Sequence, residues 1–227
     1  MQPYRRFNPQ YRERLRLAEG TWVELRLVRP EDGALLREGF ERLSPRSRYQ
    51  RFLGARPRLS EEEVRYLTWV DGEAHFALGA VTWGPDGREV GLGVARFIRL
   101  PGRPEVAELA VTVVDEAQGK GLGGLLVRRL VEAARERGLE RLECRVLPFN
   151  RQMYRMLRAL TPCEPEKDED ALCFTVPLSA PPRGGGELLG SLLALAAQGA
   201  LTLLGPTFRW RVLPCATPPS GLEEARS

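Results

Sequence analysis

The sequence has little histidine, little lysine and no close pair of cysteines. Among 227 residues, the only histidine is His75 and the only lysines are Lys120 and Lys167. The four cysteines, at 144, 163, 173 and 215, form no C-x-x-C pair, so we expect no metal site of the usual zinc spacing. A Ser-His-Asp or Cys-His catalytic set would have to use His75, and no G-x-S-x-G motif lies near it. These shortages argue against a zinc enzyme and against a triad hydrolase.

Long apolar runs are also scarce. Residues 1–10 are polar and lack the apolar stretch of a signal peptide, so we expect a cytoplasmic protein with reduced thiols. The one nearly uncharged run, 188–204, has 17 residues, which is at the short end of what crosses a bilayer. We favour a buried or partner-covered helix there, with a membrane anchor as the alternative.

Basic charge is concentrated near the start of the chain. Residues 1–60 carry 14 basic and 7 acidic side chains, whereas the whole chain has a net charge of +4. Such a segment can attract phosphate groups or nucleic acid. We favour a solvated arginine-rich surface instead, and we expect no nucleic-acid partner.

The spacing of apolar residues predicts an ordered series of strands and helices. The first half is a hairpin over 14–28, three helices between 30 and 70, and strands over 76–83 and 90–100. Ser60 and Glu63 form a capping-box pattern at the third of these helices. The second half is a strand over 107–114, a helix over 121–137, a strand over 142–147, a helix over 150–160 and a strand over 171–178. The expected fold class is therefore α+β.

Composition divides the chain into three parts. Residues 1–13 are expected to form an N-terminal arm, and 14–180 a globular domain. A Pro/Gly-rich linker opens the extension 181–227, which would also contain the apolar helix, a strand over 208–213 and a tail.

The most specific motif joins the strand over 107–114 to the helix over 121–137. Its turn reads Gln118-Gly119-Lys120-Gly121-Leu122-Gly123-Gly124. Glycines let a ligand approach the backbone closely, and the unpaired N–H groups at a helix start attract phosphate oxygens. The segment therefore predicts an anion site.

Two common phosphate loops fit this segment poorly. A nucleotide P-loop needs Ser or Thr after Gly-Lys, and here Gly121 follows Lys120. A dinucleotide fold runs its first strand almost directly into the first glycine, whereas residues 115–118 intervene here.

A third possibility fits both the spacing and the context. Gln118-x-x-Gly121-x-Gly123 resembles the acetyl-CoA pyrophosphate loop of the GNAT N-acetyltransferases. The resemblance covers about 14–178 and is closest to the acetyltransferase module of bacterial protein lysine acetyltransferases. It is carried also by segments 27–32, 40–52, 70–75 and 107–111. It implies a GNAT fold, with a mixed, mostly antiparallel central sheet that is splayed at the acetyl-CoA site and flanked by helices.

The resemblance also implies where acetyl-CoA, the co-substrate, would bind. The pantetheine arm would lie between the strands over 107–114 and 142–147, against the backbone of Val111, Thr112 and Val113. A backbone N–H near Val111 would polarise the thioester carbonyl. Asn150 would contact the coenzyme arm, cap the helix that it opens, or do both. The pyrophosphate would be held by Gln118, Gly119, Lys120, Gly121, Leu122, Gly123 and Gly124.

The resemblance further implies a general base. A lysine ammonium with a pKa of ~10.4 must lose a proton before it attacks, at a cost of roughly 4.6 kcal/mol at pH 7. Glu108 matches the glutamate of the family's A-E-x-A-V stretch, and a charged residue within a valine-rich run is costly without a purpose. The alternative for Glu108 is an ion pair with an arginine, and Glu105 is the fallback base.

Three features leave roles open. Many relatives have a tyrosine as general acid where this chain has Leu157, and Tyr154 is expected to face another side of the helix. His75 is interpreted as structural rather than as a proton shuttle. Arg48, Tyr49 and Arg51 either line the acceptor side or fasten their helix.

We therefore predict an acetyl-CoA-dependent N-acetyltransferase. The first-choice acceptor is a protein lysine and the second is a small amine, and a homodimer is considered. The alternative is a catalytically weak GNAT-fold module that senses acetyl-CoA.

Overall fold

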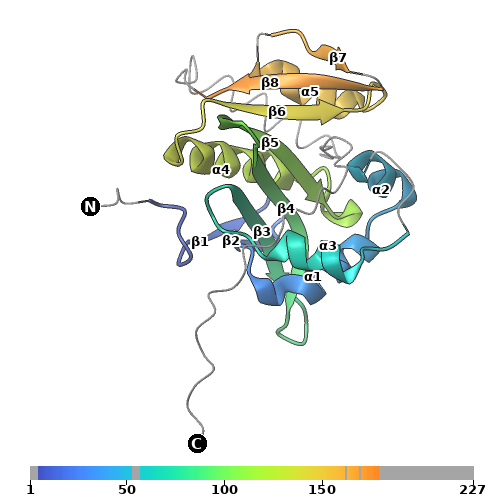
Figure 1. Cartoon of the computed structure of the whole chain (residues 1–227). Helices are drawn as coiled ribbons and strands as arrows, with labels where there is room; N and C mark the ends of the chain where they lie inside the picture. Colours follow the sequence, from blue (N-terminus) through green and yellow to red (C-terminus); the bar gives the residue numbers. More distant parts are fainter. Residues whose placement is uncertain (1–4, 53–56, 162, 169, 179–227) are drawn as a thin grey trace, which may run out of the picture.

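The computed structural model describes residues 5–52, 57–161, 163–168 and 170–178 (Figure 1). Its strands form one sheet in the order β1-β2-β3-β4-β5-β6-β8-β7. The strands are β1 (Arg12–Arg16), β2 (Trp22–Leu27), β3 (His75–Trp83), β4 (Glu89–Leu100), β5 (Arg103–Val113), β6 (Arg141–Val146), β7 (Glu166–Asp168) and β8 (Ala171–Pro177). The α-helices are α1 (Gly33–Glu41), α2 (Pro45–Phe52), α3 (Glu61–Thr68), α4 (Leu122–Glu136) and α5 (Arg151–Leu160). This mixed, mostly antiparallel sheet with flanking helices confirms the expected α+β class.

The elements expected between 181 and 227 lie outside the described residues. Within the described part of the chain, no helix has the length and apolar character needed to cross a membrane. The sequence pattern did not predict β7, which is three residues long.

The expected capping box starts α3. The Ser60 hydroxyl accepts a hydrogen bond from the Glu63 N–H at 3.1 Å, and the Glu63 carboxylate accepts one from the Ser60 N–H at 2.8 Å. Two amide donors that the helix itself leaves unpaired are thereby satisfied. The local sequence thus fixes where the helix begins.

The sheet divides between β5 and β6. These two strands are parallel and pair only at Val106 with Arg141, Ala107 with Leu142, and Glu108 with Glu143. Beyond Glu108, β5 continues to Val113 along β4, while β6 continues to Val146 along β8. The strands therefore part after Glu108, and we call the opening between their separated ends the notch.

Helices cover both faces of the sheet. Helices α1 and α3 contact each other, and α1 lies on β4, while α4 packs on β4 and β5 from the other side (Figure 1). On that side Leu109, Val111, Leu126 and Leu130 are almost completely buried. This burial anchors α4, whose first turn lies next to the notch.

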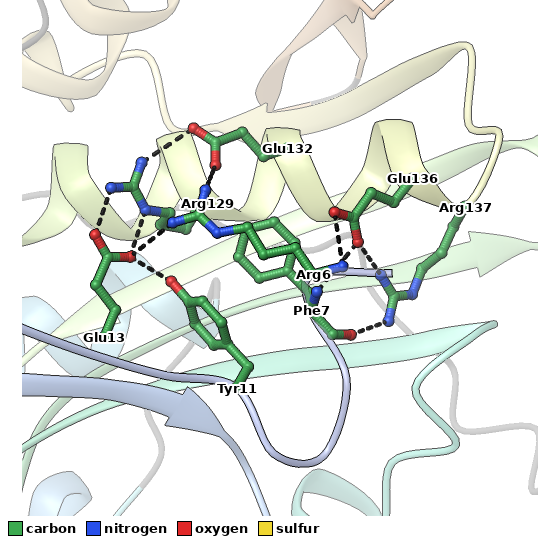
Figure 2. Close-up of polar contacts among 8 residues, drawn as sticks. All are labelled: Arg6, Phe7, Tyr11, Glu13, Arg129, Glu132, Glu136 and Arg137. Atoms are coloured by element: carbon green, nitrogen blue, oxygen red, sulfur yellow. Dashed lines mark hydrogen bonds and ion pairs between the residues drawn. The ribbon is translucent and has the colours of Figure 1, made fainter. Parts of the chain in front are cut away.

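The segment before β1 is fastened to α4 (Figure 2). Phe7 is buried in the core, its N–H donates to the Glu136 carboxylate at 3.2 Å, and its carbonyl accepts from Arg137 Nη2 at 2.9 Å. The Arg137 guanidinium lies over the Phe76 ring at 4.1 Å. Part of the segment expected as an arm therefore packs on the domain.

A second group of contacts continues along α4 (Figure 2). Arg129 forms two hydrogen bonds of 2.6 Å to the Glu13 carboxylate and one of 3.0 Å to Glu132. Arg6 reaches the other oxygen of Glu132 at 2.9 Å, and the Tyr11 hydroxyl donates to Glu13. These bonds hold α4 from its solvent side.

Candidate active site

The turn between β5 and α4 presents a row of unpaired backbone amides. Gly119 and Gly121 have φ angles of 76° and 86°, which favour glycine because a Cβ atom would be strained there. Gly121 is the N-cap of α4 and has no side chain to satisfy the first turn. Within the described residues, the N–H groups of 119–124 donate no hydrogen bond, whereas Leu125 N donates to Gly121 O at 3.1 Å. This amide row, residues 119–124, lies at the positive end of the helix dipole and suits a phosphate group.

The side chains of Gln118 and Lys120 are held by the protein itself. The Gln118 amide group donates to Val113 O at 3.0 Å and to Asp115 Oδ1 at 3.2 Å. Its backbone N–H donates to Asp115 O. The Lys120 ammonium lies 3.2 Å from a carboxylate oxygen of Glu19 in the β1–β2 turn. In this conformation Gln118 shapes the turn, and the free donors begin at Gly119.

The backbone of β5 points into the notch at Val111 and Val113. The Val114 N–H donates to Leu92 O, on the β4 side. Successive residues of a strand direct their peptide groups to opposite sides. The peptide groups of Val111 and Val113 therefore face the notch, whereas that of Thr112 faces β4. This places the N–H groups of Val111 and Val113 and the carbonyl of Val111 where the resemblance expects the pantetheine arm, whereas the Val113 carbonyl accepts from the Gln118 side chain.

Glu108 lies where the strands part. It is opposite Ile98 on β4 and Glu143 on β6, and within the described residues its carboxylate makes no hydrogen bond or ion pair. Burial raises the pKa of Glu108 from 4.5 to about 8, against the lowering effect of Arg51 and Arg145. The structure thus shows a partly buried carboxyl group of high proton affinity, not the arginine-paired carboxylate of the alternative interpretation.

The other titratable candidates are engaged elsewhere. Glu105 lies 3.5 Å from Arg141, at the paired end of β5 and β6. His75 Nε2 lies 3.0 Å from Arg96 Nη1, and burial together with Arg96 lowers the pKa of His75 to about 3. A neutral imidazole that accepts a hydrogen bond from Arg96 is consistent with a structural role for His75.

The residues around α5 have mainly structural contacts. The Asn150 side chain accepts from the Met153 N–H at 3.2 Å, so the expected cap is present. Leu157 is 1% exposed and belongs to the core. The Tyr154 ring packs against Phe174 with ring centroids 5.5 Å apart. The position of the usual tyrosine therefore holds a core leucine here.

The three residues of α2 whose roles were open make different contacts. Arg48 fastens its helix, because its guanidinium donates to the carbonyls of residues 41, 43 and 57. Arg51 Nε donates to Thr112 Oγ1 on β5 at 2.9 Å. Tyr49 stacks on Phe149, which follows β6, with ring centroids 6.4 Å apart. Arg51 therefore lies on the same face of β5 as Glu108, whereas Tyr49 joins α2 to the segment after β6.

Sequence reasoning missed one charged residue on this face of the sheet. Arg96 on β4 is 3% exposed and lies opposite Ala110, the residue after Glu108 and Leu109. A charged residue inside an apolar strand run was the available signal, the same one that drew attention to Glu108.

Comparison with known proteins agrees with this geometry. The family model "Acetyltransferase (GNAT) family" matches residues 36–160. The chain belongs to the GNAT acetyltransferase family. The match includes the amide row, the notch strands and Asn150.

Similar proteins point to one branch of GNAT acetyltransferases. The chain is 33% identical over 141 residues to Acetyltransferase Pat of Mycolicibacterium smegmatis, covering 62% of this chain and 41% of that protein. It is 32% identical over 144 residues to Acetyltransferase PA5475 of Pseudomonas aeruginosa, covering 63% and 76%. The GNAT domain of the S. lividans protein PAT superposes with a TM-score of 0.65 and 26% identity, covering 73% of this chain and 96% of that domain. The matched region therefore spans less than half of the Mycolicibacterium protein.

Proposed function

We propose that this protein transfers the acetyl group of acetyl-CoA to a primary amine. The observation that carries the proposal is the alignment of the amide row, the notch and Glu108 along one side of β5. GNAT acetyltransferases typically use acetyl-CoA, whose thioester supplies the activated acetyl group. The proposal places the protein in the cytoplasm. That two copies of the chain form a homodimer stays a prediction.

The amide row would hold the coenzyme. The N–H groups of 119–124 would hydrogen-bond the pyrophosphate, with the dipole of α4 favouring its charge. The peptide groups of Val111 and Val113 would pair with the pantetheine arm, as an added strand pairs with a sheet edge. Asn150 would contact the same arm near the start of α5. Together these contacts would place the thioester carbonyl beside Glu108.

Glu108 would serve as the general base. Its carboxylate would take a proton from the acceptor ammonium, and the neutral nitrogen would then attack the carbonyl carbon. As the N–C bond forms, the Val111 N–H would stabilise the negative charge that develops on the carbonyl oxygen. The C–S bond then breaks and the sulfur leaves as a thiolate, because Leu157 offers no proton. The nitrogen gives its remaining extra proton to this thiolate, so that the products are the neutral amide and the free thiol.

The acceptor is the finer part of the proposal. The resemblance and the relatives named Pat support a protein lysine as the first candidate, with a small amine as the second. The positive charges of Arg51 and Arg145 around Glu108 favour the small amine.

A second candidate is an acetyl-CoA-sensing module without substantial turnover. The specific observation in its favour is Leu157, because a buried leucine replaces the hydroxyl that many relatives have there. Both candidate functions use the same coenzyme site, but the sensor would bind acetyl-CoA without transferring its acetyl group.

Thiol release separates these two functions. The full chain would be incubated with acetyl-CoA and a panel of lysine peptides and small amines, and free thiol and acetylated product would be quantified together. The enzyme is expected to release one thiol for each acetylated amine. Tight coenzyme binding by calorimetry with no acetylated product from any amine would favour the sensor instead.

A further inference from the structure

A cavity of about 100 Å³ lies between helices α1–α3 and the sheet. Its wall is mainly apolar and includes Leu35, Phe40, Phe52, Leu67 and Val94. For scale, an apolar cavity of ~150 Å³ in another protein binds benzene. The space here therefore suits a small apolar side chain.

Glycines on two sides keep this space open. A Cβ atom at Gly79 of β3 would come no closer than 3.6 Å to another group, and one at Gly39 of α1 no closer than 3.9 Å. Neither glycine is required by close packing, and both line the cavity. Larger side chains at these positions would fill it.

Two buried arginines line the cavity, and they differ in their partners. Arg26 is neutralised, because it makes two hydrogen bonds to Asp32 at 2.7 and 2.8 Å and two to Glu89 at 2.6 and 3.4 Å. Arg96 Nη1 has only the carbonyl of Leu67 and the ring of His75, each at 3.0 Å. Within the described residues, no carboxylate pairs with Arg96, and its Nε and Nη2 make no hydrogen bond to the protein, although these two atoms are not fully buried.

A buried guanidinium without an anion is costly. Burial and the nearby charge of Arg51 lower the pKa of Arg96 to about 9, so it remains cationic at neutral pH. Arg51 also lines the cavity. An anionic group in this end of the cavity would balance the charge and use the free N–H donors.

Arg96 and Glu108 lie close together on one face of the sheet. Arg96 faces Ala110, whereas Glu108 is two residues earlier on β5, so the two side chains are diagonal neighbours across β4 and β5. Diagonal neighbours in a sheet are about 7–8 Å apart at their α-carbons. One small molecule can therefore reach both groups, with an amine at Glu108 and a carboxylate at Arg96.

We propose that the acceptor is a free amino acid with an apolar side chain, whose carboxylate binds Arg96 and whose side chain fills the cavity. This inference rests on the proposed function. The amino group would face Glu108 at the notch. A lysine side chain would bring a cation toward Arg96 without a carboxylate of its own, whereas a free amino acid carries a carboxylate that can pair with this guanidinium.

The test compares acceptors that differ only in the carboxylate. Steady-state thiol release would be measured with leucine, leucinamide and a lysine peptide at saturating acetyl-CoA. The expected kcat/KM for leucine exceeds that for leucinamide by about 100-fold, because the amide cannot pair with a buried guanidinium. In Arg96→Gln, the kcat/KM for leucine should exceed that for leucinamide by no more than a few-fold.

A second pair of variants probes the cavity without touching its charge. Gly39→Leu would project into the cavity, and Gly39→Ala is its matched control. We expect Gly39→Leu to raise the KM for leucine at least ten-fold with little change for alanine. Gly39→Ala, which adds only one carbon to the cavity wall, should raise the KM for leucine by less than Gly39→Leu does.

A binding measurement separates failure of this inference from failure of the proposed function. Calorimetry would measure how tightly the product, N-acetylleucine, binds to the wild type and to Arg96→Gln. If the protein acetylates lysine peptides, and its kcat/KM values for leucine and leucinamide are both low and equal, the inference is overturned and the proposed function stands. Transfer to no amine, with N-acetylleucine still bound through Arg96, would overturn the proposed function and support the carboxylate site.

Discussion

Replacing Glu108 with glutamine removes the proposed base while nearly preserving its shape. Burial raises the pKa of this carboxyl group from 4.5 to about 8. Each pKa unit corresponds to 1.36 kcal/mol, so the carboxylate is a stronger base by about 5 kcal/mol than an exposed glutamate. The pKa of Glu108 therefore comes within a few pH units of the pKa of an amine. General-base catalysis typically contributes roughly 10²–10⁴-fold, which is the loss of kcat/KM that we expect in Glu108→Gln.

The pH profile gives the sharper measurement. In the wild type, kcat/KM should rise with pH and level off above about pH 8, where Glu108 becomes ionised. In Glu108→Gln this inflection should disappear, and the remaining rate should follow the ionisation of the amine itself. Glu105→Gln is the matched control, because Glu105 lies on the same strand with Arg141 at 3.5 Å and should keep the wild-type profile.

Stability provides a readout that does not depend on turnover. The unfolded chain ionises Glu108 near pH 4.5 and the folded chain only near pH 8, so the folded state binds the extra proton between these values. Its free energy of unfolding therefore falls as pH rises through this range. In Glu108→Gln, this fall in the free energy of unfolding between the two pH values should be absent. Denaturant titrations at pH 5 and pH 8.5 would measure it in both proteins. Unchanged kcat/KM, together with an unchanged pH dependence of stability, would refute the reasoning.

Four further substitutions, one of them a control, test other parts of the structure. Gly121→Ala should weaken coenzyme binding in calorimetry and cost about 1 kcal/mol, because its φ of 86° is unfavourable for alanine. Gly87→Ala in the β3–β4 turn, with φ of 75°, should show a similar stability loss and unchanged coenzyme affinity. The Arg129 hydrogen bonds lower the pKa of Glu13 to about 2, so this pair stabilises the fold above pH 4.5 and loses that effect as pH falls toward 2. Glu13→Gln should therefore lower the unfolding free energy at pH 7 by roughly 2–3 kcal/mol and much less at pH 2, measured by denaturant titration. Asn150→Ala should cost about 1 kcal/mol in thermal unfolding through loss of the α5 cap, and an unchanged melting temperature would contradict the capping role.

Local patterns predicted the elements around the site well. The capping box at Ser60, the cap at Asn150 and the glycine turn before α4 each depend on neighbours a few residues apart. The apolar and valine-rich runs placed β3 and β4 to within one residue, whereas β5 begins at Arg103, four residues before its predicted start. The strand β7 was missed because three polar residues pair with β8 only in the folded sheet.

Side-chain partners were less predictable. The sequence could not show whether Glu108 pairs with an arginine, because the answer depends on which of many arginines the fold brings near it. His75 shows the same limit, since its partner Arg96 lies 21 residues away along the chain, on the neighbouring strand β4.

By itself, the sequence determined the order of strands and helices, the glycine turn that exposes the amide row, and the membership of the GNAT family that this turn suggested. These depend on short-range rules of backbone geometry and capping. The tertiary structure alone decided that β5 and β6 part after Glu108, that Glu108 stays unpaired, and that Arg96 faces an apolar cavity. Those properties depend on burial and on contacts between distant segments, and desolvation exists only once the chain has folded around the group.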